Sequence, residues 1–270
     1  MTTASRPAFK PLLAFAHELA DAAGAAILPH FRKPIPIEDK GSDGRYDPVT
    51  AADRAAERRI AKAIAQRFPD HGLIGEEYGV VNPGARYRWV VDPIDGTRAF
   101  IMGSPLWGTL IGLVEGGTPV LGLMDQPFTG ERFWSDAAAS YWSGPKAKAR
   151  RNRLRTRACP SIDRAVLTTT HPTLLATAAD RAAFRRLEAK ARMTRYGGDC
   201  YAYCLLAAGF VDCVVESGLK PYDIVALIPI IERAGGRISA WDGGPATSGG
   251  RILAAGDPRL HEQMVATLAA

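Results

Sequence analysis

Apolar residues recur at helical spacing in two segments near the start of the chain. Residues 8–32 carry them roughly every three or four positions, and residues 50–68 repeat the pattern with Ile60 and Ile64. A Thr-x-x-Asp sequence at Thr50 has the form of a helix cap, in which side chains and backbone satisfy each other's hydrogen bonds. We therefore predict two amphipathic helices, each with one apolar face for packing.

Short runs rich in β-branched and aromatic residues follow in the middle of the chain. They are expected to form strands at residues 35–37, 73–75, 89–91, 108–114, 120–124, 132–135 and 140–142. Gly116-Gly117 and Thr129-Gly130 separate later runs in the manner of hairpin turns. Successive strands joined by tight turns predict an antiparallel sheet in this part of the chain.

Helical and strand-like segments alternate in the rest of the chain, which is typical of an α/β domain. Strands are expected at residues 165–168, 193–196, 212–216, 237–240 and 252–254, and helices at 174–191, 200–208 and 223–234. Pro229 is expected to kink the last helix, because proline removes the hydrogen bond to the carbonyl of Val225. We predict an N-terminal α+β domain of residues 1–145 and a C-terminal α/β domain of residues 146–270.

Composition limits the class of protein. Of the 270 residues, 47% are hydrophobic and 23% are charged, as in ordinary globular proteins. No apolar run approaches the roughly 18 residues that cross a bilayer, and the N-terminus lacks the apolar core of a signal peptide. The four cysteines show no zinc-binding spacing, so we expect buried thiols and a reduced, cytoplasmic protein without a membrane partner.

The net charge of +6 comes largely from a basic stretch at residues 146–157. Such stretches can bind nucleic acid. This one lacks interleaved aromatic residues, and no nucleic-acid-binding motif surrounds it. A solvated connecting loop with an edge strand is the preferred interpretation, and no nucleic-acid partner is predicted.

Residues 88–100 carry the most distinctive chemistry. The strand in this stretch is expected to stop at the Asp92-Pro sequence, so that Asp92 and Asp95 emerge close together. Two such carboxylates repel each other unless a proton or a cation lies between them, and Mg²⁺ prefers oxygen ligands. The backbone amides of Gly96 and Thr97, at the start of a short helix, are suited to bind an anion. The alternative is an ordinary turn without chemistry.

Further acids stand where strands end or helices begin. Glu76 and Glu77 follow a strand, Asp53 lies at the start of a helix, and Asp223 opens another. The alternative interpretation makes Asp53 and Asp223 helix caps and Glu77 a solvated surface acid. A metal site requires several of these acids to converge with the pair in residues 88–100.

These segments together resemble a known family. Residues 75–77 (Gly-Glu-Glu), residues 92–97 (Asp-Pro-Ile-Asp-Gly-Thr) and residues 222–236 (Tyr-Asp and a helix ending in Ala-Gly-Gly) are similar to the inositol monophosphatase superfamily of Mg²⁺-dependent, lithium-sensitive phosphatases. The resemblance runs from about residue 10 to residue 255. It implies a layered αβαβα sandwich of the sugar-phosphatase type, a site between two domains, and a homodimer.

The resemblance also implies two to three Mg²⁺ ions per subunit. One would be held by Glu76, Asp92 and the carbonyl of Ile94, and a second by Asp92, Asp95 and Asp223. Glu76 would help to hold a third, weaker ion.

Catalytic roles are implied in the same way. Glu76 and Thr97 would orient the attacking water, and the Gly96 and Thr97 amides would hold phosphoryl oxygens. Asp53 resembles an aspartate that hydrogen-bonds near this threonine, and Lys40 lies near the position of a mobile-loop lysine. Hydrolysis by a metal-activated water needs no covalent enzyme intermediate.

The substrate has to be inferred from other segments. Residues 97–111 and 196–203 resemble the histidinol-phosphate phosphatase branch, in which the substrate carries an ammonium and an imidazole. Asp199 and Glu216 could accept hydrogen bonds from such a cationic group, although Asp199 could instead cap a helix. The expected substrate contacts are Asp95, Gly96, Thr97, Asp199, Glu216 and Asp223.

We therefore predict a Mg²⁺-dependent phosphomonoesterase that hydrolyses L-histidinol phosphate in histidine biosynthesis. A phosphatase for inositol 1-phosphate or a broad range of sugar phosphates is the alternative within the superfamily. A metal- or nucleic-acid-binding protein without turnover is the alternative from a different class.

Overall fold

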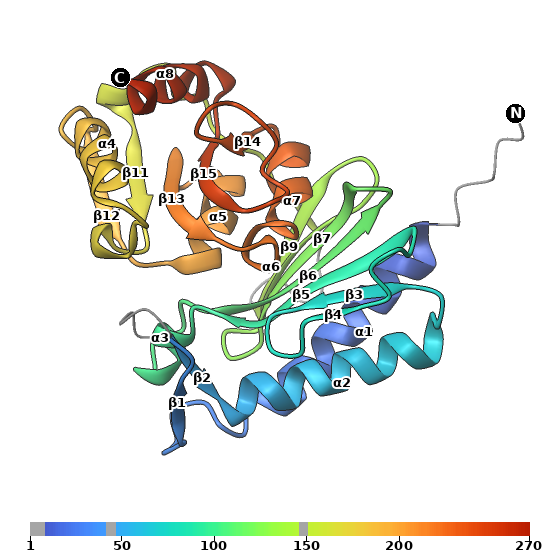
Figure 1. Cartoon of the computed structure of the whole chain (residues 1–270). Coiled ribbons are helices and arrows are strands. Elements are labelled where there is room, and N and C mark those ends of the chain that lie inside the picture. Colours follow the sequence, from blue (N-terminus) through green and yellow to red (C-terminus); the bar gives the residue numbers. More distant parts are fainter. Residues whose placement is uncertain (1–8, 42–46, 146–150) are drawn as a thin grey trace, which may run out of the picture.

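The computed structural model describes residues 9–41, 47–145 and 151–270. Helices and sheets alternate in layers, in the order helix, sheet, helix, sheet, helix (Figure 1). The predicted αβαβα sandwich is confirmed. Three hydrophobic clusters occupy the spaces between successive layers, so each layer is fixed by apolar packing on its neighbours.

Two helices form one outer layer, below the larger sheet in Figure 1: α1 (Phe9–Ile27) and α2 (Ala51–Arg67). Thr50 caps α2 as predicted, since its hydroxyl accepts the Ala52 N–H at 3.2 Å and Asp53 accepts the Thr50 N–H at 2.9 Å. Helix α1 ends at Ile27, before the predicted residue 32, and the chain continues in turns to Arg32, which has a left-handed φ of 57°. The segment between the helices contributes a hairpin of β1 (Ile37–Asp39) and β2 (Pro48–Thr50).

Eight strands of the described residues form the larger sheet, in the order β10-β9-β8-β7-β6-β5-β3-β4. They are β3 (Gly72–Gly75), β4 (Val80–Val81), β5 (Tyr87–Asp95), β6 (Gly108–Glu115), β7 (Thr118–Gln126), β8 (Glu131–Ser135), β9 (Ser140–Ser143) and β10 (Asn152–Arg153). The predicted antiparallel pairing is confirmed from β5 to β9, whereas β3 runs parallel to β5. Strand β4 was not predicted, because a two-residue strand leaves no periodic pattern in the sequence. Strand β10 is the edge strand expected within residues 146–157.

Strand β5 corrects one prediction. It does not stop at Asp92 but continues to Asp95, and its register with β6 shifts between these residues. This bulge accommodates Pro93, which has no N–H to donate to the ladder, and the Pro93 carbonyl accepts the Thr109 hydroxyl at 2.8 Å. The short helix predicted next is present as α3 (Thr97–Ile101).

The middle layer of helices lies between the two sheets. It consists of α5 (Asp199–Ala207), α6 (Pro221–Ile224) and α7 (Leu227–Ala234). The helix predicted at residues 223–234 is divided at Val225 and Ala226 into α6 and α7, where Pro229 has no N–H to donate to the carbonyl of Val225. Gly122 of β7 lies directly beneath the break, where an added Cβ would come within 1.8 Å of the Ala226 carbonyl oxygen.

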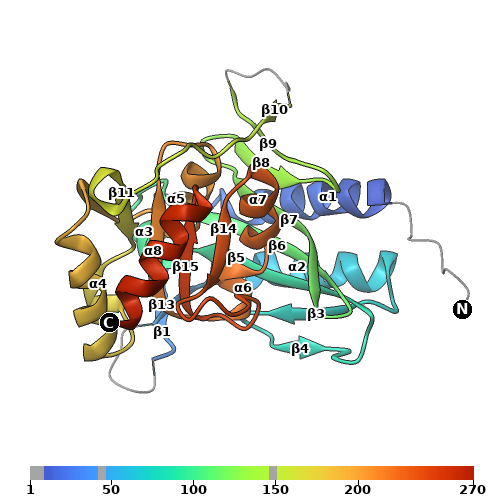
Figure 2. The same ribbon diagram turned by 90° about the horizontal axis from the view of Figure 1, so that it is seen from above.

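The smaller sheet and two helices complete the sandwich. In the described chain its order is β12-β11-β13-β15-β14, built from β11 (Val166–Thr169), β12 (Met193–Tyr196), β13 (Cys213–Leu219), β14 (Arg237–Ala240) and β15 (Gly250–Ala255). Its outer face is covered by α4 (Ala178–Glu188) and α8 (Pro258–Ala269), seen from above in Figure 2. Helix α4 starts later than the predicted residue 174, because Thr177 caps it after a short 3₁₀ turn. Helix α8 was not predicted.

The division into domains at residue 145 stays a prediction. Strand β10 lies beyond that boundary and pairs with β9 of the larger sheet. Residues 42–46 of the predicted loop and residues 146–150 of the basic stretch lie outside the described residues. None of the described helices is long and apolar enough to cross a bilayer. All four cysteines are buried, and none of them forms a disulfide.

The close approach at Gly122 gives a test of how the middle layer is seated. We expect Gly122→Ala to lower the free energy of unfolding by about 1–3 kcal/mol or more, because the new methyl group meets backbone that cannot move aside. Gly84→Ala is the matched control, since a Cβ there meets nothing within 4 Å. Denaturant unfolding of both variants measures the difference. Equal stability of the two variants would contradict this packing.

Candidate active site

A cavity of about 720 Å³ opens between the two sheets. Residues from separate parts of the chain line it, and among them are nearly all of the residues predicted for the site. These are Lys40, Glu76, Asp92, Ile94, Asp95, Gly96, Thr97, Asp199, Glu216 and Asp223. The predicted residue missing from the lining is Asp53.

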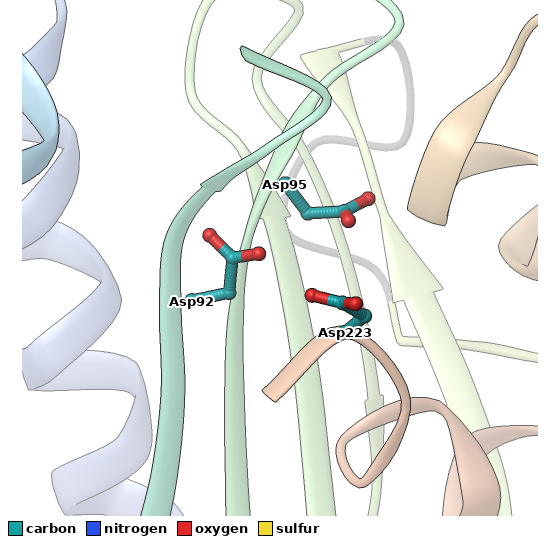
Figure 3. Close-up of side chains that lie close together, drawn as sticks. All are labelled: Asp92, Asp95 and Asp223. Carbon is teal, nitrogen blue, oxygen red and sulfur yellow. The ribbon is translucent and has the colours of Figure 1, made fainter. Parts of the chain in front are cut away.

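Three aspartates that line the cavity point toward one another (Figure 3). Asp92 and Asp95 lie on either side of the bulge in β5, and Asp223 reaches them from α6. One carboxylate oxygen from each lies within 4.8 Å of the others. The predicted convergence of these acids is therefore present, and the bulge explains it, because a regular strand would alternate its side chains between the two faces.

The electrostatics of this group favour a cation. Burial, together with the charges of Glu76, Asp95 and Asp223, raises the pKa of Asp92 well above its ordinary value. Burial and the charges of Asp199 and Asp223 do the same for Asp95, and burial raises the pKa of Asp223 to about 7. An all-oxygen set of buried, mutually repelling carboxylates fits a hard divalent ion such as Mg²⁺.

Glu76 joins this group from the end of β3. Its charge helps to raise the pKa of Asp92, and its Oε1 lies 3.1 Å from the Lys40 ammonium. Lys40 also contacts Glu77 at 2.6 Å, and the side chain of Glu77 is only 3% exposed. Burial lowers the pKa of Lys40, but the two glutamates outweigh burial and raise the pKa above its ordinary value. Glu77 is thus a buried acid, and the interpretation of Glu77 as a solvated surface residue is wrong.

Asp53 lies behind the cavity wall as part of the cap of α2. One oxygen accepts the Thr50 N–H at 2.9 Å and the Thr50 hydroxyl at 2.6 Å, while the other has no hydrogen-bond partner among the described residues. Burial raises the pKa of Asp53 to about 7. The Thr97 hydroxyl donates to the Ile94 carbonyl at 3.1 Å. The capping interpretation of Asp53 is confirmed, and its link to Thr97 stays a prediction.

The N-terminus of α5 orients Asp95, which the sequence did not reveal. The Cys200 N–H donates to Asp95 Oδ2 at 2.6 Å. Gly96 follows with φ of 89°, a conformation that suits glycine, and an added Cβ would come within 3.1 Å of the Asp199 side chain. The start of α5 and the end of β5 are therefore in close contact.

Two further acids, Asp199 and Glu216, also line the cavity, and their charges help to raise the pKa of Asp95. Glu216 accepts the Thr170 N–H at 2.9 Å and the Tyr203 hydroxyl at 3.1 Å, so much of its acceptor capacity is used within the protein. Burial and the charge of Glu216 raise the pKa of Asp199 to about 7, against a lowering by Arg98. His171, to which the sequence gave no role, also lines the cavity.

The fold and the cavity agree with the comparisons to known proteins. The model of the inositol monophosphatase family matches residues 9–270, so the chain belongs to this family and is a phosphoric monoester hydrolase.

Similar proteins carry two kinds of name. The chloroplastic bifunctional phosphatase IMPL2 of Arabidopsis thaliana is 43% identical over 266 residues, which cover 94% of this chain and 74% of the relative. A histidinol-phosphatase of Chlorobaculum parvum is 33% identical over 260 residues, 96% of each chain. The solved structure of an inositol monophosphatase from Zymomonas mobilis superposes with a TM-score of 0.86 at 42% identity, covering 98% of this chain and 100% of that chain.

The raised carboxyl pKa values predict how metal stabilises the protein at different pH. The folded-state pKa of Asp223, about 7, exceeds its ordinary value of 3.8. The folded protein therefore keeps a proton that the unfolded chain loses, and the metal-free fold loses stability as the pH rises through this window. Since a cation replaces that proton, Mg²⁺ is expected to raise Tm little near pH 5 and most above about pH 7.

Thermal melts in EDTA and in excess Mg²⁺ across this range measure the effect. The difference in Tm between the two conditions cancels the pH dependence that comes from ionisable groups far from the metal site, such as the buried His261. Mg²⁺ at about 100 times its Kd would add about 2.7 kcal/mol of stability. Asp95→Asn is expected to reduce the gain. A gain that is independent of pH in the unmodified protein would count against a carboxylate metal site.

Proposed function

We propose that the protein is a Mg²⁺-dependent phosphomonoesterase that acts on L-histidinol phosphate. The observation that carries the proposal is the gathering of Glu76, Asp92, Asp95 and Asp223 at one cavity in a member of a phosphatase family. Phosphate monoesters resist hydrolysis because their negative charge repels nucleophiles. Carboxylates alone would repel the negatively charged substrate, so a site rich in carboxylates can bind it only when the site also holds cations.

The protein's own groups have distinct parts in this proposal. Glu76, Asp92, Asp95, Asp223 and the Ile94 carbonyl would hold two to three Mg²⁺ ions. The bound ions would lower the pKa of a water and neutralise the phosphoryl oxygens. Glu76 and Thr97 would orient that water, and the Gly96 and Thr97 amides would hold the phosphoryl group.

Two further acids of the cavity, Asp199 and Glu216, support a cationic substrate. Asp199 is buried beside Glu216, and a carboxylate in that position is stabilised by an ammonium or imidazolium partner. Because Glu216 is already held by Thr170 and Tyr203, Asp199 is the better candidate for the direct contact. Histidinol phosphate offers such a cationic group, and the relative from Chlorobaculum parvum is named for it.

Hydrolysis of inositol 1-phosphate is the second candidate. The similar solved structure from Zymomonas mobilis bears the name of that activity, and acids can also bind ring hydroxyls. A homodimer, a cytoplasmic location and a place in histidine biosynthesis are part of the proposal without a separate observation. A metal-binding protein without turnover is the remaining alternative, and Mg²⁺-dependent phosphate release distinguishes it.

The choice of substrate can be tested directly. We expect kcat/KM for L-histidinol phosphate to exceed that for inositol 1-phosphate, because only the former places a cation near Asp199. Phosphate release at saturating Mg²⁺ measures both, and EDTA is the blank. A higher value for inositol 1-phosphate would overturn the substrate assignment and leave the phosphatase assignment intact.

Asp199→Asn tests the residue behind that preference. Asp199 has φ of 42°, a conformation that asparagine also tolerates, so the backbone of the variant should be preserved. Loss of a charge-assisted hydrogen bond of about 1.5–3 kcal/mol predicts about a 10- to 100-fold fall in kcat/KM for histidinol phosphate. The fall for inositol 1-phosphate should be smaller. Equal losses for both substrates would argue against a role in selectivity.

A further inference from the structure

Helix α2 buries a glutamate whose charge needs an explanation. Glu57 lies one helical turn after Asp53 and is fully buried on the face that packs against the larger sheet. Its neighbours on that face, Ala56 and Ile60, are apolar and also fully buried. Taking a carboxylate out of water is costly unless hydrogen bonds replace its solvation. Glu57 is absent from the cavity lining, so contact with substrate does not explain it.

The hydrogen bonds of Glu57 go to the turn that follows β3. Its Oε2 accepts the Glu77 N–H at 2.8 Å, and its Oε1 accepts the Tyr78 N–H at 3.0 Å. The next residue of the helix, Arg58, donates to the Tyr78 hydroxyl. Both oxygens of one buried carboxylate thus hold consecutive backbone amides.

Gly75 shows how closely the carboxylate fits under this turn. An added Cβ at Gly75 would come within 1.9 Å of Glu57 Oε1, far inside any real contact. Only glycine at the end of β3 lets the carboxylate reach the two amides. The turn is closed on its other side by the Gly75 N–H, which donates to the Gly79 carbonyl at 2.9 Å.

Glu76 lies between these fixed points. Its backbone is bounded by Gly75, which packs on Glu57, and by Glu77, whose N–H is held by Glu57. Its side chain faces Asp92 in the cavity and would otherwise be pushed away by that like charge. Hydrogen bonds from residues just outside a metal site orient the metal ligands and keep neighbouring carboxylates in place against their mutual repulsion.

We propose that Glu57 is a positioning residue for the metal site, which holds the Gly75–Tyr78 backbone so that the Glu76 carboxylate stays directed at Asp92. The inference rests on the proposed metal role of Glu76 and adds a residue that touches neither substrate nor ion. Gln cannot replace Glu57, because its amide group has a single acceptor oxygen and its NH₂ would face a backbone N–H.

Mg²⁺ affinity measured by calorimetry without substrate tests the proposal. Glu57→Gln is expected to weaken Mg²⁺ binding by about 10- to 100-fold, and added Mg²⁺ should recover turnover. Asp257→Asn is the matched control for a buried carboxylate that bonds backbone amides away from the cavity. It should lower Tm while leaving the Mg²⁺ affinity unchanged. Unaltered affinity in Glu57→Gln would show a structural role only and overturn the proposal.

A second variant separates position from charge. Gly75→Ala keeps every charge but places a methyl group where the Glu57 carboxylate lies, so it should weaken Mg²⁺ binding as well. Normal affinity in this variant beside weak affinity in Glu57→Gln would assign the effect to charge alone and overturn the proposal.

Amide hydrogen exchange on the unmodified protein covers the case in which neither variant folds. The Glu77 and Tyr78 amides should be protected, and exchange at the rate of an open loop would overturn the proposal. If the unmodified protein itself fails to bind Mg²⁺, the proposed function fails instead, which keeps the two failures distinct.

Discussion

Repulsion among buried carboxylates is the constraint on which the rest of this structure depends. Asp92, Asp95 and Asp223 bring their oxygens within 4.8 Å of one another, and Glu76 adds a fourth acid. Without a cation or protons this arrangement is unfavourable, as the raised pKa values of the group indicate. The remaining packing must therefore hold the acids in place against their own charge. The same stored repulsion is what makes the site attractive to a divalent cation.

The scaffold resists this repulsion through close backbone contacts. The α6–α7 break rests on Gly122, the turn that carries Glu76 rests on Glu57 beneath Gly75, and the N-terminus of α5 holds Asp95. The first and third contacts join the middle helices to the larger sheet, and the second joins α2 of the outer layer to the turn after β3. A site assembled in this way is rigid because no ligand depends on a single flexible loop.

The cavity holds two groups of acids, which come from different elements of the fold. The acids at β3, β5 and α6 are the proposed Mg²⁺ ligands, and the phosphoryl group that such ions would bind is common to all phosphate esters. Asp199 and Glu216, from α5 and β13, border the remaining space. The side chains that line a cavity decide function on a shared fold, and the similar proteins carry different substrate names on this one.

The sequence by itself determined the layered fold, most helices and strands, and the set of acids that meet at the cavity, because those features follow from hydrophobic periodicity and from a combination of motifs. It could not show that β5 continues through Pro93, since a bulge depends on pairing with β6. It placed Glu77 among possible surface acids and gave Glu57 no role, because burial and hydrogen bonds to distant backbone arise only when the layers pack. Local patterns are fixed by neighbours along the chain, whereas the orientation of each carboxylate is decided by residues far away in the sequence.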